Sequence, residues 1–186
     1  MRKKLWGLWV VTHWLMALLV IVTFAIGLAS LNEISDPAGK VVPLQVHLVL
    51  GGLIFALVTA RYFMRVLVYK KPWGWNLPAV TNDRKKAFLL DQADRYVHPL
   101  LYLATFLMVV LGMAISLPAG LGPTLFFESG TAVPEDFSIY PARAWHGVLS
   151  TVLLLLVFQH VLAAVFHVLI KRDGYLRRMW FRRGGE

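Results

Sequence analysis

Long apolar stretches dominate the chain, and short polar segments separate them. Four stretches are long enough to cross the hydrocarbon core of a bilayer, which takes about 20 apolar residues in a helix: residues 5–31, 41–69, 97–117 and 142–170. This pattern predicts an all-α membrane protein in which residues 1–186 form a single four-transmembrane-helix bundle. The first apolar run is far longer than the roughly 7–15 residues of a signal peptide, so we expect an uncleaved helix.

The polar segments contain shorter predicted elements. Residues 84–96 are expected to form a short helix on the membrane surface. Residues 118–141 are rich in Gly and Pro but keep bulky apolar side chains, so we expect them to fold back as a cap. The tail at 174–183 mixes aromatic and aliphatic residues with arginines, which is typical of an interfacial anchor. Membrane lipid is therefore an expected partner.

Basic residues gather at one end of the predicted bundle. They lie before the first span, between the second and third spans, and after the fourth span. The opposite connections have only Lys40 and Arg143 as bases, against five acidic residues. The positive-inside rule then places both termini in the cytoplasm. The same rule explains the net charge of +9 without a nucleic acid partner.

Composition narrows the possible chemistry. A hydrophobic content of 58% excludes an ordinary soluble domain. The chain has no cysteine, which excludes disulfides, thiolate-ligated iron–sulfur clusters and covalent c-type haem.

Histidines inside the spans are the main functional signal. Four of the six histidines lie there: His13, His47, His146 and His160. His146 and His160 are fourteen residues apart on one predicted helix, which is about 1400° of rotation and about 21 Å of rise. Both imidazoles therefore face the same way, and two cofactors could stack across one membrane.

Depth in the membrane suggests how these histidines pair. His47 and His146 each lie a few residues after the outer start of their helices, so they can meet near the outer face. His13 and His160 both lie about 27 Å inward from the outer end. When depth is measured from the inner ends of the helices, His13 lies between the levels of His160 and His167. Depth alone therefore does not decide which of these two histidines pairs with His13.

Haem fits two imidazoles per site better than a bare metal ion does. Buried histidine in a membrane span is costly and indicates function, although hydrogen bonding between helices is an alternative. A zinc or copper site is a second alternative. Zinc, however, takes about four protein ligands, and no carboxylate lies near these histidines in the spans. Haem supplies four equatorial nitrogens and needs only axial ligands. We therefore predict two non-covalent haems of the b type, each bound by two histidines.

Small and basic residues accompany the histidines. Arg61 lies fourteen residues after His47 and so faces the predicted inner haem, while Arg143 precedes His146 by three residues. Both are candidate partners for the anionic haem propionates. A flat macrocycle between helices also needs close backbone approach, and several glycines occupy suitable positions: Gly27, Gly51, Gly112 and Gly147.

Several short motifs carry a family resemblance. They are Thr-His-Trp-Leu at 12–15, Val-His-Leu-Val-Leu-Gly at 46–51, Ala-Arg-Tyr-Phe-Met-Arg at 60–65, Trp-His-Gly at 145–147, Gln-His-Val-Leu-Ala-Ala-Val-Phe-His at 159–167 and Lys-Arg-Asp-Gly-Tyr-Leu-Arg-Arg-Met at 171–179. In their order, spacing and topology the chain resembles the prokaryotic cytochrome b561 family. That family is itself similar to the haem-carrying membrane subunits of hydrogenases and formate dehydrogenases.

The resemblance implies the ligand set. The axial ligands in this family come from the first, second and fourth helices, with fourteen residues between the two on the fourth. On this chain the pattern pairs His13 with His160 and His47 with His146 as iron ligands. His98 and His167 are left as non-ligands. His98 could hydrogen-bond a propionate or a quinone, or serve only as a helix cap or interface residue, and His167 is expected to make a surface or propionate contact.

The implied function is electron transfer in the bacterial inner membrane. An iron with both axial positions filled can only exchange single electrons. The resemblance implies exchange between the quinone pool, with ubiquinone as a candidate, and a periplasmic donor or acceptor, which is superoxide for some members. Two alternatives stay open: a haem b membrane-anchor subunit of a periplasmic oxidoreductase such as a hydrogenase or dehydrogenase, and a haem-free scaffold or transporter. The sequence does not decide whether the chain is itself a quinone-linked oxidoreductase, forms a homodimer or needs a partner subunit.

Overall fold

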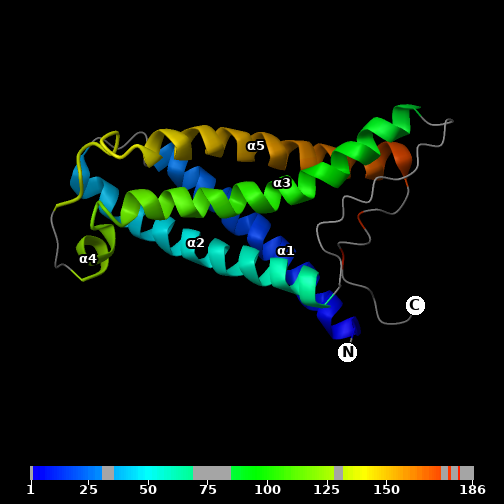
Figure 1. Cartoon of the computed structure of the whole chain (residues 1–186), viewed down its shortest axis with the longest axis horizontal. Coiled ribbons are helices and arrows are strands. Elements are labelled where there is room, and N and C mark those ends of the chain that lie inside the picture. The colour runs from blue at the N-terminus through cyan, green and yellow to red at the C-terminus, as the bar shows by residue number, and fades with distance from the viewer. Residues whose placement is uncertain are drawn as a thin grey trace.

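Four long helices form an antiparallel bundle in the computed structural model (Figure 1). The structure describes residues 2–30, 36–68, 85–127 and 132–172, with Leu176 and Trp180. The long helices are α1 (Arg2–Ala25), α2 (Pro37–Phe63), α3 (Lys85–Ser116) and α5 (Ala142–Phe166). The short helix α4 (Leu121–Phe126) lies at the end where α2 and α5 begin, which we name the outer end; the end where α1 begins is the inner end.

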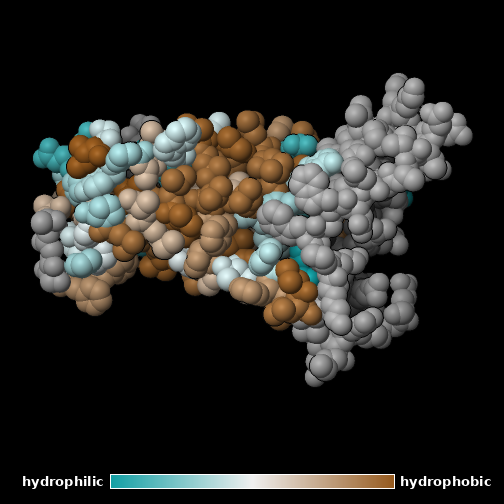
Figure 2. All heavy atoms as spheres, in the orientation of Figure 1, coloured by the Kyte–Doolittle hydropathy of each residue, from teal (hydrophilic) through white to brown (hydrophobic). Residues whose placement is uncertain are grey.

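The four predicted membrane spans are confirmed. Each long helix contains a stretch long and apolar enough to cross a bilayer: Gly7–Leu28, Pro37–Leu67, Tyr96–Ser116 and Ala142–Ile170. On the face drawn in Figure 2, a brown apolar band covers the middle of the bundle. Side chains such as Ile21 (60% exposed) and Phe158 (60% exposed) point outward, which in water would be strongly unfavourable. This surface therefore requires lipid around it.

Helix ends differ from the sequence prediction by a few residues. The second helix begins at Pro37 rather than at residue 41, because the Asp36 carboxylate accepts hydrogen bonds from the Ala38 and Gly39 amides at 3.3 and 3.0 Å. Proline at the first helical position suits this start. A π-helical turn extends α1, α2 and α5: η1 (Ile26–Ser30), η2 (Met64–Val68) and η3 (His167–Lys171).

Helix α3 corrects one prediction. Residues 84–96 were expected as a separate surface helix, but from Lys85 onward they form the first part of α3. The helix continues through Pro99, because the hydrogen bond lost at a proline can be compensated by neighbouring helices and local adjustment in a membrane bundle. Only the part from Tyr96 to Ser116 is apolar enough to span.

A small apolar cluster closes the outer end, as the sequence predicted. Its buried residues are Leu44, Ala119, Leu121, Leu125 and Val133. The side-chain amide of Gln45 donates a 2.6 Å hydrogen bond to the Leu125 carbonyl, which ties α4 to α2. Gly120 starts α4 with a φ of +62°, a backbone conformation that favours glycine.

Two predictions rest mostly on residues outside the described ranges. The tail at 174–183 is described only at Leu176 and Trp180, and the Trp180 ring lies 6.1 Å from that of Trp14 on α1. Most of the basic residues that predict cytoplasmic termini are likewise not described, so the orientation stays a prediction.

Candidate functional site

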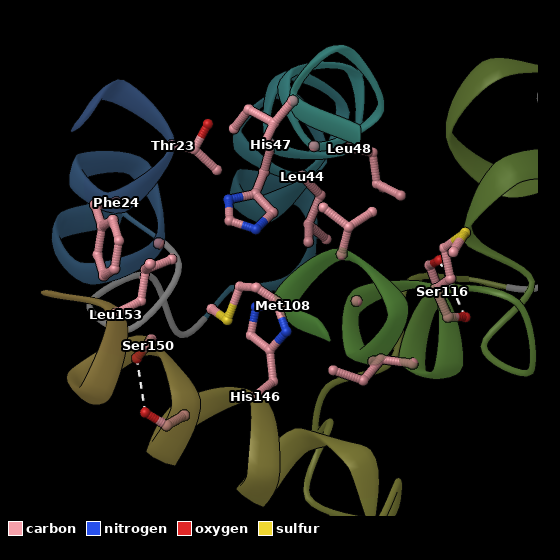
Figure 3. Close-up of a pocket in the computed structure, with 18 of the residues that line it drawn as sticks. Thr23, Phe24, Leu44, His47, Leu48, Met108, Ser116, His146, Ser150 and Leu153 are labelled. Carbon is pink, nitrogen blue, oxygen red and sulfur yellow. Dashed lines mark hydrogen bonds between the residues drawn. The ribbon is translucent and has the colours of Figure 1, made fainter. Parts of the chain in front are cut away.

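The outer histidine pair joins two helices across a large cavity. His47 on α2 and His146 on α5 point toward each other (Figure 3), with their ring centres 6.4 Å apart and their planes at 60°. The cavity has a volume of about 540 Å³ and is also lined by residues of α1 and α3. That volume falls within the roughly 300–1,000 Å³ of known cofactor and ligand pockets.

The inner histidine pair has almost the same geometry. His13 on α1 and His160 on α5 have ring centres 6.1 Å apart, with planes at 74°. His98 on α3 also approaches His160, at 5.0 Å and 83°. The structure thus brings together both pairs that the family resemblance implied, and it adds His98 to the inner one.

The ring spacings can be compared with those around one metal ion. A metal–imidazole bond of about 2.0 Å, with about 1.1 Å from that nitrogen to the ring centre, places two opposed imidazoles about 6.2 Å apart. The His47–His146 and His13–His160 separations of 6.4 and 6.1 Å fit this value. The 5.0 Å between His98 and His160 is too short for an ion between the rings. The geometry therefore favours His13 over His98 as the partner of His160.

Two glycines bring helix backbone close to the outer imidazoles. A Cβ atom on Gly27 of η1 would lie 3.5 Å from Cε1 of His47, and one on Gly112 of α3 would lie 3.5 Å from Cε1 of His146. Gly27 lies four residues after Thr23, whose backbone faces the His47 ring. Gly112 lies four residues after Met108, whose backbone faces the His146 ring.

These backbone groups suit histidines that bind a metal. Nδ1 of His47 and Nδ1 of His146 are buried. In the described structure neither atom makes a hydrogen bond with the usual distance and angle. A histidine that ligates a metal through one nitrogen usually donates the other N–H to a carbonyl or carboxylate. The Thr23 and Met108 backbones offer that acceptor, which leaves Nε2 of each ring available to an iron.

The Gly27 contact gives a testable consequence. Gly27→Leu is expected to displace His47 and to lower the haem content from about two per chain toward one, because the leucine side chain extends beyond a Cβ already 3.5 Å from the ring. Gly27→Ala should be tolerated, since 3.5 Å is ordinary van der Waals contact. Gly7→Leu is the matched control on α1, where no heavy atom lies within 4 Å of the added Cβ. Full haem content in Gly27→Leu, measured per mole of protein, would contradict this role.

Arg61 is buried beside the inner pair, at the level the sequence predicted. Only 3% of it is exposed. Nη1 of Arg61 donates to the Trp9 carbonyl at 2.6 Å and to Oγ1 of Thr12 at 2.7 Å, and the guanidinium lies 4.1 Å from the centre of the Trp9 ring. Arg61 therefore fixes α2 to the turn of α1 that carries His13.

The sequence interpretation missed Trp9 and Thr12 as partners of Arg61. The available signal was position, because Trp9 lies one turn before His13 on the same face of α1. Helical periodicity could not show that α2 packs beside this turn of α1, because it does not reveal which helices are neighbours.

Arg143 and Lys40 both line the outer cavity. Nη1 of Arg143 lies 3.3 Å from the position of a Cβ on Gly147, which places the guanidinium beside the turn that carries His146. Nζ of Lys40 donates to the Glu135 carbonyl at 3.4 Å. The pKa of Asp136 is lowered, chiefly because the Ser138 hydroxyl and amide donate to its carboxylate, with a smaller contribution from Lys40. Two cations thus lie at the outer mouth of the cavity.

The ligand sets suit haem rather than a bare ion. Within the described part of the chain, no three His, Cys, Asp or Glu side chains are arranged as a set that could hold a metal ion. Each candidate site has two opposed imidazoles, and haem provides the remaining four nitrogens itself.

Comparison with known proteins agrees with this chemistry. The sequence model of the prokaryotic cytochrome b561 family matches residues 6–182, which include all four spans. No curated protein and no solved structure matches the chain. From the family match over nearly its whole length, the chain belongs to the prokaryotic cytochrome b561 family and is a multi-pass membrane cytochrome that binds haem b and transfers electrons.

Proposed function

We propose that the chain carries electrons across the bacterial inner membrane through two non-covalent b-type haems. His47 and His146 bind the iron of the outer haem, and His13 and His160 that of the inner haem. The observation that supports this most strongly is the pair of ring separations, 6.4 and 6.1 Å, with one member of each pair on α5. A haem held by two histidine side chains would supply one-electron transfer and leave no open iron position for a substrate.

Basic side chains hold the propionates in this proposal. Arg143 and Lys40 line the outer cavity and would pair with the propionates of the outer haem. Arg61 provides a buried cation beside the inner pair. Its contacts with Trp9 and Thr12 also orient the α1 turn that presents His13.

The proposed orientation places both termini in the cytoplasm and the α4 cap in the periplasm. It is supported by the basic residues that precede the first span, lie between the second and third spans, and follow the fourth span, under the positive-inside rule. The outer haem then lies near the periplasm and the inner haem near the cytoplasm, within a single domain of residues 1–186. Lipid surrounds the apolar faces of all four spans.

The electrons are proposed to pass between the quinone pool, with ubiquinone as the candidate, and a periplasmic donor or acceptor. The outer connections contain five acidic residues against two bases, so long-range attraction does not favour an anionic donor such as superoxide. Lys40 and Arg143 at the cavity mouth give only a local positive charge.

Reduction of the reconstituted protein by separate donors tests this function. A quinol is expected to reduce the haems of the isolated chain, followed by the change in haem absorbance, without any second polypeptide. If dithionite reduces the haems but no quinol and no external donor does, the chain is better explained as the membrane anchor of a periplasmic oxidoreductase. Copurification of such a partner would support that alternative, and the mass of the complex in detergent would distinguish it from a homodimer.

A further inference from the structure

A second cavity lies between α2 and α3, toward the inner side of the outer haem cavity. Its volume is about 410 Å³, and its lining includes Thr59, Tyr62 and Phe63 of α2 and Tyr102, Leu103 and Phe106 of α3. All six positions fall within the membrane spans. Phe63 is 53% exposed and Leu103 is 43% exposed on the outside of the bundle, so a ligand can enter this cavity from the bilayer.

The cavity has apolar walls with a hydroxyl group that lacks a partner. Oγ1 of Thr59 is buried and makes no hydrogen bond in the described structure. Thr12 and Thr23, also in membrane helices, donate to the carbonyl four residues earlier, at 2.8 and 2.7 Å. A buried hydroxyl without a partner is unfavourable and uncommon. Thr59 lines this cavity, so a rotation of its side chain would present an unsatisfied donor to a ligand there.

Aromatic rings connect this cavity with the outer haem cavity. Phe55 lines the haem cavity and Phe106 lines the second one, and their ring centres are 5.6 Å apart with planes at 33°. Val58, which is 2% exposed, lies between Phe55 and Thr59 in the sequence and also lines the second cavity. A ligand there would be separated from the haem cavity by about one layer of side chains.

We propose that this cavity binds the head group of a membrane quinone, with Thr59 donating a hydrogen bond to one ring carbonyl. A quinone ring is flat and apolar, presents carbonyl acceptors and reaches proteins from the bilayer, which matches each property of the cavity. The acyl chain of a lipid also fits the apolar walls, but it offers no acceptor to Thr59 at this depth. This inference rests on the proposed exchange of electrons with the quinone pool and identifies where that exchange takes place.

Photolabelling of the haem-loaded protein tests the location. A ubiquinone analogue with an azido group on its ring is expected to label peptides containing residues 58–63 or 102–106, and unlabelled quinone should suppress the labelling. Labelling confined to other segments, or labelling in the cavity that excess quinone does not suppress, would overturn the assignment. A copurified acyl chain that quinone fails to displace would overturn it as well.

Two variants test the assignment by affinity, measured from quinone quenching of tryptophan fluorescence and corrected for the added indole. Leu103→Trp fills the cavity and is expected to weaken quinone binding about tenfold or more. Leu107→Trp is its matched control: it lies one turn along α3, is 40% exposed against 43% for Leu103, and does not line the cavity. Binding to the control should stay within about twofold of the parent protein. Thr59→Val keeps the shape, removes the donor and should weaken binding roughly three- to tenfold.

Haem content and absorbance must match those of the parent in all three variants, which excludes a general loss of folding. Unchanged quinone affinity in both Leu103→Trp and Thr59→Val would overturn the inference. Failure of the proposed quinone location can be distinguished from failure of the proposed function. Haems that quinol reduces, with labelling elsewhere, contradict only the location; absence of haem, or haems that quinol does not reduce, contradicts the function wherever the label falls.

Discussion

His47→Ala and His13→Ala are each expected to remove one haem and to leave the other in place. The two pairs share no residue, and their members on α5 lie about 21 Å apart along the helix axis. Loss of one axial imidazole removes an iron ligand and opens a gap at one site only. The pyridine haemochrome assay, expressed per mole of protein, should fall from about two haems toward one in either variant.

His98→Ala is the control for this prediction. His98 also lies beside His160 of the inner pair, but the two ring centres are 5.0 Å apart, which is too close for an iron between them. The variant should therefore keep both haems. If His98→Ala lost a haem while His13→Ala retained two, the inner ligands would be wrongly assigned.

Arg61→Gln should lower the reduction potential of one haem by about 50 to 100 mV. A positive charge favours the reduced state, because reduction removes one positive charge from the haem. At about 10 Å and an effective dielectric constant near 20, a unit charge contributes on the order of 2 kcal/mol, or roughly 80 mV for one electron. Glutamine can still donate to the Trp9 carbonyl or the Thr12 hydroxyl, so the α1 turn should stay in place.

Arg143→Gln is the counterpart on the other side of the membrane. It should lower the potential of the outer haem and leave that of the inner haem nearly unchanged, since Arg143 lines the outer cavity. Optical redox titration of the parent and both variants separates the two haems by their midpoint potentials. A shift of the same haem in both variants would contradict the assignment of one arginine to each site.

Much of the fold followed from the apolar pattern, because span length and helical periodicity are local properties of the sequence. The fourteen-residue spacing placed His146 and His160 on one face, and depth brought His47 to the level of His146. Depth could not choose the partner of His13, since that choice depends on which helices are neighbours. The contacts of Arg61 with α1 were hidden for the same reason.

Other features depend on helix rotation and on local capping. The second cavity lies between α2 and α3, and its lining residues carry no motif that marks them in the sequence. The start of α3 was misplaced because its polar first part was taken for a separate element, with Pro99 near the boundary. The sequence marked Gly27 and Gly112 as positions suited to close backbone approach, and both contact the outer imidazoles, but it gave no role to the Thr23 and Met108 backbones.

Low-temperature electron paramagnetic resonance of the fully oxidised protein tests the central claim most directly. Two irons, each with two axial imidazoles, should give two low-spin ferric haem signals, each accounting for about one iron per chain. A wild-type protein that contains no haem, shows a single low-spin signal of one iron per chain, or shows a high-spin ferric signal from an iron with an open axial position would contradict the account.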